Sequence, residues 1–262
     1  YILSRMPIKP FGELATDFSF TTFYSITLLP ITLNTMYYQN TDKFLISVDC
    51  IIFGFHKKEL HVLLTRRPVE PKLNEWSLMG GFMEEGESLS EAAEKVLYRY
   101  TQQKDIYMEQ VAAYGDVNRD TGGRVVSVAF YALVKTEKFN TSLAKKFDAK
   151  WINIKELPQL VFDHNKMVMD ALMLLQYKVS TQPVAFHFFN DKFTLPALQD
   201  LYEAIYQMEL DKRNFRKKLS TMEILDKLEE KDKMNSKRGA YFFTFNKHKY
   251  NKFLAEGKRF SL

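Results

Sequence analysis

A glycine-rich loop that joins a strand-like run to a helical run constrains the fold more than any other feature of this 262-residue sequence. Three glycines lie within Gly80–Gly86, and glycine provides the backbone freedom that a tight connection requires. Ser88 or Ser90 can cap a helix that runs to about Tyr100, with Glu91 in its first turn. The pattern therefore predicts a unit of strand, loop and helix.

The segments around this unit alternate between strand-like and helical patterns. Runs of β-branched and aromatic residues predict strands, whereas Met167, Ala171, Leu174 and Leu175 recur at helical spacing. The predicted strands are residues 44–55, 61–66, 76–82, 110–118, 124–135 and 150–154, and the second helix is residues 162–177. The first two strands form a hairpin, and residues 119–123 form another hairpin turn. This mixture predicts an α+β fold in which helices cover a sheet as layers.

Positive charge is concentrated in the last third of the chain. The residues after Gln182 contain 16 Lys and Arg against 11 Asp and Glu, whereas residues 1–182 contain 21 of each class. This asymmetry indicates either an anionic partner, with nucleic acid as the first candidate, or a basic face in contact with solvent. A polar stretch at residues 178–183 ends in proline, and we expect a domain boundary there.

The region after this boundary has the pattern of two consecutive helices. Thr194 and Asp211 are the predicted N-caps. In the second helix, Phe215 and Leu219 lie one turn apart, where they can dock on the first helix. The candidate DNA contacts on the outer face of this helix are Lys212, Arg213, Asn214, Arg216, Lys217 and Lys218. Cations suit phosphates, and Arg or Asn side chains suit base edges, so this helix is a predicted recognition helix.

A charged turn and an aromatic strand follow the second helix. Residues 229–239 are polar and charged, and residues 240–246 are rich in aromatic side chains. Lys233, Lys237 and Arg238 would lie where the wing of a DNA-binding domain contacts the backbone or the minor groove. Two helices followed by a wing predict a winged helix-turn-helix domain. A basic helical cap with a solvated hairpin is the alternative.

The glycine-rich loop and its helix resemble the box of the Nudix family. That box has a glycine, five residues, a glutamate, seven residues and then Arg-Glu-x-x-Glu-Glu-x-Gly. The first half matches this sequence, because Gly81 and Glu87 have the required spacing and Trp76 and Gly80 stand where relatives have them. The resemblance covers the box and, more loosely, about residues 43–177, and it implies a Nudix-like α/β/α sandwich.

The second half of the box departs from the family pattern. Lys95 stands at the arginine position, Gln102 at the glycine position, and Val96, Arg99 and Tyr100 at the three glutamate positions. Residues spaced i, i+3 and i+4 share one helical face, and in active relatives that face offers carboxylates to Mg²⁺, which prefers oxygen ligands. Here the face offers an aliphatic group, a cation and a phenol. We therefore expect neither a metal site nor catalytic residues, no cofactor, and a protein that is not an enzyme.

A cleft beside the loop can still bind a polar small molecule. Its candidate effector contacts are Arg66, Arg67, Trp76, Phe82, Glu85, Glu87, Asp116 and Arg119. The alternative is a hydrolase of a nucleoside diphosphate derivative with an atypical metal site, because Glu84, Glu85 and Glu87 remain in the loop. Those glutamates lack the carboxylates of the helix, so the sequence favours a sensor.

The two parts together resemble the Nudix-related transcriptional regulators of bacteria, which join a degenerate Nudix domain to a winged helix. Further matches include Gly115–Asp120 and Asp211–Arg216. The resemblance implies a homodimer that binds a palindromic double-stranded DNA operator and responds to a small effector. Some relatives respond to ADP-ribose and others to sugars such as L-arabinose, in which case they control carbohydrate catabolism. Because residues 1–182 carry no net charge, we expect a sugar first and ADP-ribose second.

The remaining features bear on location and on the ends of the chain. Cys50 is the single cysteine, so we expect a buried thiol in a reducing, cytoplasmic compartment. No run reaches the ~18 apolar residues of a membrane span. The recognisable pattern begins near Met36, and we expect residues 1–35 to be an extension outside the native product, ahead of the effector domain (36–180) and the DNA-binding domain (181–262).

Overall fold

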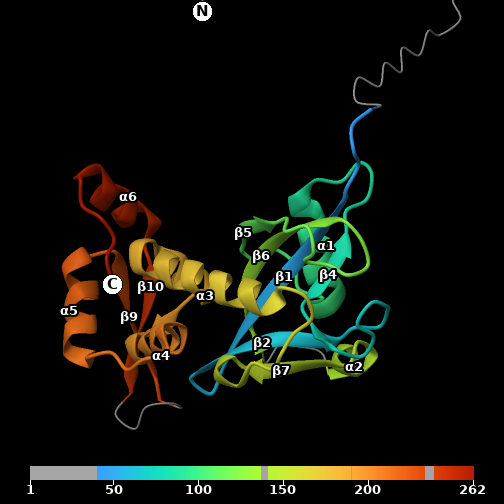
Figure 1. Cartoon of the computed structure of the whole chain (residues 1–262). Helices are drawn as coiled ribbons and strands as arrows, with labels where there is room; N and C mark the ends of the chain where they lie inside the picture. The colour runs from blue at the N-terminus through green and yellow to red at the C-terminus, as the bar shows by residue number, and fades with distance from the viewer. Residues whose placement is uncertain (1–39, 137–140, 190, 234–238) are drawn as a thin grey trace, which may run out of the picture. The chain divides into compact units, whose positions relative to one another are not determined.

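A seven-stranded mixed sheet forms the centre of the part of the chain that precedes residue 180 (Figure 1). The computed structural model describes residues 40–136, 141–189, 191–233 and 239–262, so the predicted extension at residues 1–35 lies outside the described residues. The strands are β1 (Leu45–His56), β2 (Glu59–Arg66), β3 (Trp76–Ser77), β4 (Met79–Phe82), β5 (Met108–Tyr114), β6 (Val125–Lys135) and β7 (Ala149–Asn153). β1 pairs antiparallel with β2 and β4 and parallel with β6. The predicted hairpin of the first two strands is confirmed.

Helices cover both faces of this sheet. The helices are α1 (Leu89–Thr101), α2 (Thr141–Lys146) and α3 (His164–Thr181), with a 3₁₀ turn η2 at Ile154–Glu156. Alternate residues of β1 point into two cores, since Ile51 packs in the cluster that contains Met167 of α3 and Ile52 packs in the cluster that contains Leu97 of α1. The predicted α/β/α sandwich is confirmed. Cys50 is a free thiol in the second core, and burial raises its pKa.

Local signals account for the loop–helix unit. Ser88 accepts a hydrogen bond from the backbone N–H of Glu91, and the Glu91 side chain accepts one from the backbone N–H of Ser88, which is a complete capping box. Gly80 lies opposite Asp49 in the sheet. A Cβ at this position would lie 2.8 Å from the carbonyl oxygen of Val48 and would collide with the Asp49 carboxylate. Glycine is therefore required here by the close approach of β1 and β4.

The C-terminal part is a winged helix-turn-helix, as predicted. Its elements are a 3₁₀ segment η3 (Pro183–Phe188), β8 (Phe193–Thr194), α4 (Leu195–Tyr206), α5 (Lys212–Met222), β9 (Leu225–Asp232), β10 (Ala240–Phe245) and α6 (Lys247–Ala255). Thr194 and Asp211 cap α4 and α5 as expected. β10 pairs with β8 and β9 to form a three-stranded sheet. α6 was not anticipated, although Asn246 supplies its N-cap.

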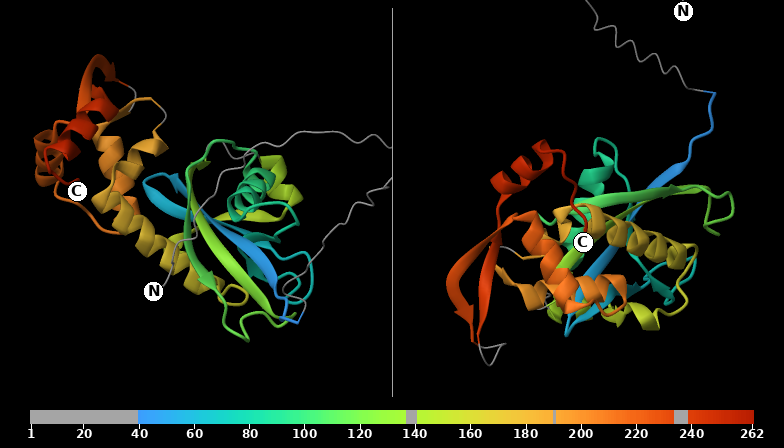
Figure 2. Two further views of the ribbon diagram at one scale, coloured as in Figure 1. Left: turned by 90° about the horizontal axis from the view of Figure 1, so that it is seen from above. Right: turned by 90° about the vertical axis from the view of Figure 1, so that its left-hand side faces the viewer.

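α3 connects the Nudix-like sheet to α4 (Figure 2). The Gln176 side chain on α3 donates a hydrogen bond to the carbonyl of Ile205 at 2.9 Å, and the Tyr202 hydroxyl on α4 donates to the carbonyl of Val179 at 3.1 Å. Contacts group Lys43–Leu262 into one compact unit, so the division at residue 180 remains a prediction. Within the described residues, no helix is long and apolar enough to cross a membrane.

Candidate functional site

A cavity of about 270 Å³ lies where the loop–helix unit meets β1 and the start of α3. Two of the predicted effector contacts, Arg67 and Phe82, line it. The other six, which are Arg66, Trp76, Glu85, Glu87, Asp116 and Arg119, are not among its lining residues. Arg99 and Tyr100 of α1 and Phe162 and His164 at the start of α3 line it instead, and the sequence did not single them out as effector contacts.

A buried polar network lies at the floor of this cavity. The Ser127 hydroxyl donates a hydrogen bond to Asp49 Oδ2 at 2.5 Å, and His164 Nε2 lies 3.7 Å from Asp49 Oδ1. The backbone N–H of Leu78 donates to His164 Nδ1 at 3.2 Å, which leaves the imidazole proton on Nε2, facing Asp49. Burial lowers the pKa of His164 although Asp49 opposes this shift, so the ring is neutral at pH 7.

Arg119 belongs to this network rather than to the cavity wall. Its side chain is only 3% exposed. Its Nε and Nη2 donate to the two carboxylate oxygens of Asp163 at 2.9 and 2.7 Å, and Nη2 lies 3.9 Å from Asp49. In this bidentate pair, Nε and Nη2 of Arg119 already donate to a carboxylate of the protein and do not point to a ligand. The structure therefore places the predicted effector contact Arg119 in a structural ion pair.

Three residues of α1 stand at the positions that carry carboxylates in active Nudix proteins, and they have different surroundings. Val96 is buried, and a Cβ added at Gly81 would lie 3.6 Å from it. Tyr100 is partly buried, and its ring centroid lies 4.6 Å from that of Phe147. Arg99 is exposed to solvent and lines the cavity. In the described part of the chain, no group of three or more His, Cys, Asp or Glu side chains is arranged to hold a metal ion.

Lys95 neutralises the carboxylates that remain in the glycine-rich loop. Its Nζ lies 2.7 Å from Glu84 Oε1 and 3.6 Å from Glu87 Oε2. The hydrogen bond from Lys95 lowers the pKa of Glu84. Glu87 also accepts a hydrogen bond from the backbone N–H of Glu84 at 2.6 Å. These two glutamates therefore stabilise the loop, while Glu85 is exposed to solvent.

The two neighbouring arginines after β2 have different surroundings. The Arg66 guanidinium stacks 3.9 Å from the centroid of the Trp76 ring and donates to the carbonyl of Asn74 at 3.0 Å. Arg67 donates through Nε to the carbonyl of Pro71 at 2.6 Å, and its guanidinium lies 5.1 Å from the centroid of Phe162. Arg67 thus lines the cavity, and its terminal NH₂ groups form no hydrogen bond with any of the described residues.

α5 presents a cationic outer face and an apolar inner face. Phe215, Leu219 and Met222 are buried, and the Phe215 ring centroid lies 5.4 Å from that of Tyr202 on α4. All six predicted DNA contacts on α5, from Lys212 to Lys218, are exposed, and the cations among them form no ion pair with any described residue. Lys233 is exposed at the end of β9, whereas Lys237 and Arg238 lie outside the described residues.

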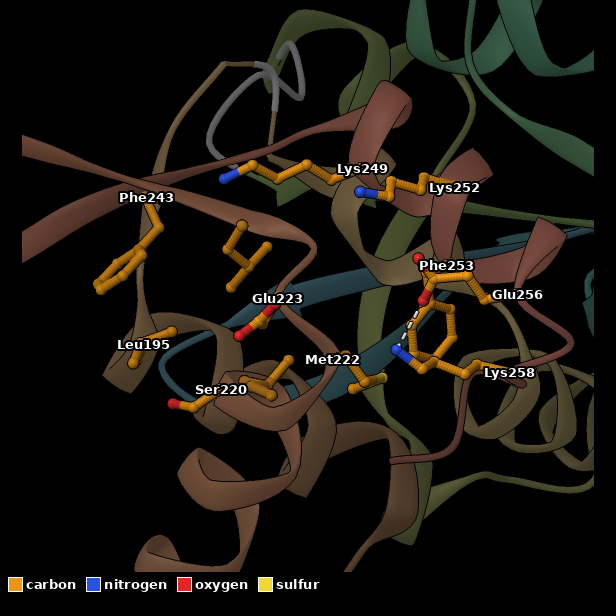
Figure 3. A pocket seen from close by; sticks show the side chains of 12 residues that line it. Leu195, Ser220, Met222, Glu223, Phe243, Lys249, Lys252, Phe253, Glu256 and Lys258 are labelled. Carbon is orange, nitrogen blue, oxygen red and sulfur yellow. Dashed lines mark hydrogen bonds and ion pairs between the residues drawn. The ribbon is translucent and has the colours of Figure 1, made fainter.

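A larger cavity, of about 560 Å³, lies between the end of α5 and α6 (Figure 3). Its lining is mixed, with Met222 and Phe253 among the apolar residues and three lysines among the charged ones. Two of its lysines already have partners, since Lys249 binds Asp226 at 2.6 Å and Lys258 binds Glu256 at 2.7 Å. In the smaller cavity beside α1, Arg99 forms no ion pair with any residue that the structure describes, so this cavity is the better candidate for an anionic ligand.

Comparisons with known proteins match both parts of the chain. The Nudix domain model matches residues 43–171, and the model described as the NrtR DNA-binding winged helix domain matches residues 185–245. The chain is 28% identical over 220 residues to the ADPR responsive transcriptional repressor NtrR of Acinetobacter baylyi, covering 82% of this chain and 88% of the relative. It is 30% identical over 127 residues to the ADP-ribose pyrophosphatase of Methanocaldococcus jannaschii, covering 48% of this chain and 72% of the relative.

The fold is also similar to that of a solved protein–DNA complex. The crystal structure of Shewanella oneidensis NrtR complexed with a 27mer DNA has a TM-score of 0.70 and 27% identity. The similarity covers 82% of this chain and 97% of that chain. It therefore extends over the Nudix-like and the winged-helix parts together.

Proposed function

This chain belongs to the family of Nudix-related transcriptional regulators, and we propose that it is a repressor that binds an operator through α5 and senses ADP-ribose in the cavity beside α1. The observation that carries the proposal is the pairing of two sites in one unit. One is a Nudix-like cavity with a cation, Arg99, at a carboxylate position. The other is a helix whose outer face carries cations without ion-pair partners among the described residues.

ADP-ribose replaces a sugar as the favoured effector. The Acinetobacter baylyi repressor and the Methanocaldococcus jannaschii enzyme are both named for ADP-ribose, and this reverses the order expected from the sequence. The cavity chemistry supports the reversal, because Arg67 and Arg99 suit a diphosphate, whereas arabinose has no anionic group for them. At the rim, Phe82 and Val69 are 58% and 54% exposed and offer an apolar surface for adenine. The expected control of carbohydrate catabolism depended on a sugar effector and loses its basis with it.

The effector proposal is tested by calorimetry on the full chain. We expect ADP-ribose to bind with a stoichiometry of one per chain and L-arabinose not to bind. Binding of arabinose alone would overturn the assignment of the effector.

Phe82→Ala is expected to weaken ADP-ribose binding by about tenfold, because stacking of a base on an aromatic ring contributes about 1–3 kcal/mol. Tyr98→Ala is the matched control, since Tyr98 is 41% exposed on α1 but does not line this cavity. Equal losses for the two variants in calorimetric titrations would show that Phe82 has no specific contact with the ligand.

α3 provides a physical connection between effector and operator. Phe162 and His164 at its start line the cavity, and Gln176 and Val179 near its end are hydrogen-bonded to α4. The helix has 18 residues, a length of about 27 Å. We propose that bound ADP-ribose changes the position or the mobility of the start of α3. This change would alter the orientation in which α4 and α5 contact DNA. By linkage, operator binding then changes ADP-ribose affinity by the same factor.

Gln176→Ala should weaken this coupling while both ligands still bind. Removing the hydrogen bond to Ile205 is expected to reduce the effect of ADP-ribose on operator affinity by about 0.5–2 kcal/mol. The measurement is a DNA titration with and without ADP-ribose. Met173→Ala is the control, because Met173 is 57% exposed on the same helix. If ADP-ribose changed the operator affinity of Gln176→Ala as much as that of the wild type, this hydrogen bond would not connect the two sites.

We also propose that the protein binds DNA as a homodimer, with half-sites about one helical turn, or ~34 Å, apart. The competing function is hydrolysis of ADP-ribose or another nucleoside diphosphate, which the likeness to the Methanocaldococcus jannaschii pyrophosphatase favours. An assay for Mg²⁺-dependent turnover separates the two functions. Robust turnover would replace the sensor proposal.

A further inference from the structure

The metal ion that the Nudix fold implies does not fit the residues of this cavity. Of the three helical positions that would supply carboxylates, Val96 is buried in the core, Arg99 is a cation and Tyr100 is partly buried against Phe147. A guanidinium in place of a ligand carboxylate repels a divalent cation at short range. The helical half of a metal site is therefore absent from α1.

The loop half of such a site is already occupied by a protein cation. Lys95 Nζ contacts Glu84 at 2.7 Å and Glu87 at 3.6 Å, so a metal ion would have to displace an ammonium group from both carboxylates. Asp49, the buried carboxylate of the floor, accepts from Ser127 and faces Arg119. Asp49 therefore already has a hydroxyl donor and a cation as partners, although it shares that cation with Asp163.

Two arginines of the cavity retain the capacity to bind an anion. Arg99 is exposed and forms no ion pair with any residue that the structure describes. Arg67 uses only Nε in its hydrogen bond to Pro71, and its guanidinium lies 5.1 Å from the centroid of the Phe162 ring. A guanidinium offers paired N–H donors that match phosphate oxygens. A diphosphate diester carries two negative charges, which these two positively charged side chains match. The two carboxylates that line the same cavity have partners in the protein, since Asp49 accepts from Ser127 and lies 3.9 Å from Arg119, and Asp120 accepts from the backbone N–H of Gly122.

From this arrangement we propose that Arg99, together with Arg67, takes the place of the divalent cation and holds the diphosphate of the effector, so that ligand binding requires no metal ion. The proposal rests on the proposed function, because it concerns the same cavity and the same ligand. It specifies which side chains recognise the diphosphate. In this chain the diphosphate is neutralised by side chains of α1 and of the loop after β2. The sensor would then respond to the effector alone and not to the concentration of Mg²⁺.

Calorimetric titration of the full chain with ADP-ribose tests this proposal in two buffers, one with EDTA and one with MgCl₂. We expect the same Kd in both buffers to within about twofold. Arg99→Gln should raise Kd by about 10- to 100-fold in both, the range for loss of one charged hydrogen-bonding group. Arg124→Gln is the matched control, because this partly buried arginine bonds to the carbonyls of Gly115 and Asp116, does not line the cavity and should leave Kd unchanged.

The results distinguish failure of the metal-free diphosphate site from failure of the proposed function. Binding that disappears in EDTA, or a Kd that Arg99→Gln leaves unchanged, would overturn the metal-free diphosphate site while ADP-ribose remains the effector. Failure of the wild-type chain to bind ADP-ribose in either buffer would overturn the proposed function itself. Because Arg99 is exposed, Arg99→Gln should keep the thermal midpoint of the wild type. A folded variant with weakened binding therefore supports a ligand contact.

Discussion

Arg119→Ala is expected to lower the free energy of unfolding by about 3–5 kcal/mol, the cost of leaving a buried charge without its partner. The substitution removes the cation that lies 2.7 Å from Asp163 and 3.9 Å from Asp49. Both carboxylates are largely shielded from water, with side chains 21% and 11% exposed. Thermal unfolding followed by circular dichroism should show a midpoint lower by roughly 6–20 °C.

Arg66→Ala is the matched control for this prediction. Arg66 is partly exposed and stacks on Trp76 without a carboxylate partner, so its loss should cost about 0.5–1 kcal/mol. If Arg119 contacted the effector instead, Arg119→Ala would keep the wild-type midpoint and lose ADP-ribose binding. That result would restore the role expected from the sequence and contradict the structural ion pair.

Replacing Arg216 and Lys217 together with alanine should lower operator affinity by at least about 30-fold. Both side chains are exposed on α5 and form no ion pair among the described residues. Their removal should therefore weaken DNA binding without lowering the stability of the fold. A base-contacting arginine contributes about 1–3 kcal/mol, and each lost phosphate contact reduces the salt dependence of binding by about one unit. Fluorescence anisotropy over a salt series measures both effects, on a duplex selected from a random library with the wild-type protein.

Lys145→Ala with Lys146→Ala controls for the loss of two positive charges. These adjacent exposed lysines lie on α2, in the Nudix-like part of the chain. They should change neither the affinity nor the salt dependence by more than a small factor. Equal effects of the two double variants would mean that only the net charge of the protein matters. That outcome would exclude α5 as the recognition helix.

The parts of the fold that the sequence predicted correctly depend on local signals. Ser88 with Glu91, Thr194 and Asp211 each cap the helix that follows, and each acts on backbone groups three residues away. The apolar face of α5 was predicted for the same reason, because Phe215 and Leu219 are one turn apart. α6 carried a comparable signal, since Asn246 accepts a hydrogen bond from the backbone N–H of Lys249. The predicted elements ended at the preceding strand.

The parts that were not predicted depend on contacts between distant residues. Arg119 lies 44 residues from Asp163, and no spacing rule connects them. Arg119 was therefore assigned to the ligand on its charge alone. Phe162 and His164 line the cavity only because α3 begins at its edge, which follows from the tertiary packing of α3 on the sheet.

The expected effector depended on the wrong measure of charge. Residues 1–182 carry equal numbers of acidic and basic side chains, and this argued against a phosphate ligand. The local distribution matters more, because Arg67 and Arg99 line the cavity while Glu84 and Glu87 are paired with Lys95. A domain without net charge can thus place two arginines in one cavity, where Asp49 and Asp120 also line the wall.

The most direct test of the central claim is the Kd of the intact chain for its selected duplex, measured with and without saturating ADP-ribose. A sensor joined to a DNA-binding domain predicts that ADP-ribose changes this Kd by about 5- to 150-fold, the usual range of allosteric coupling, and that the nucleotide is recovered intact. An identical Kd in the presence of ADP-ribose that calorimetry shows to be bound would contradict the claim.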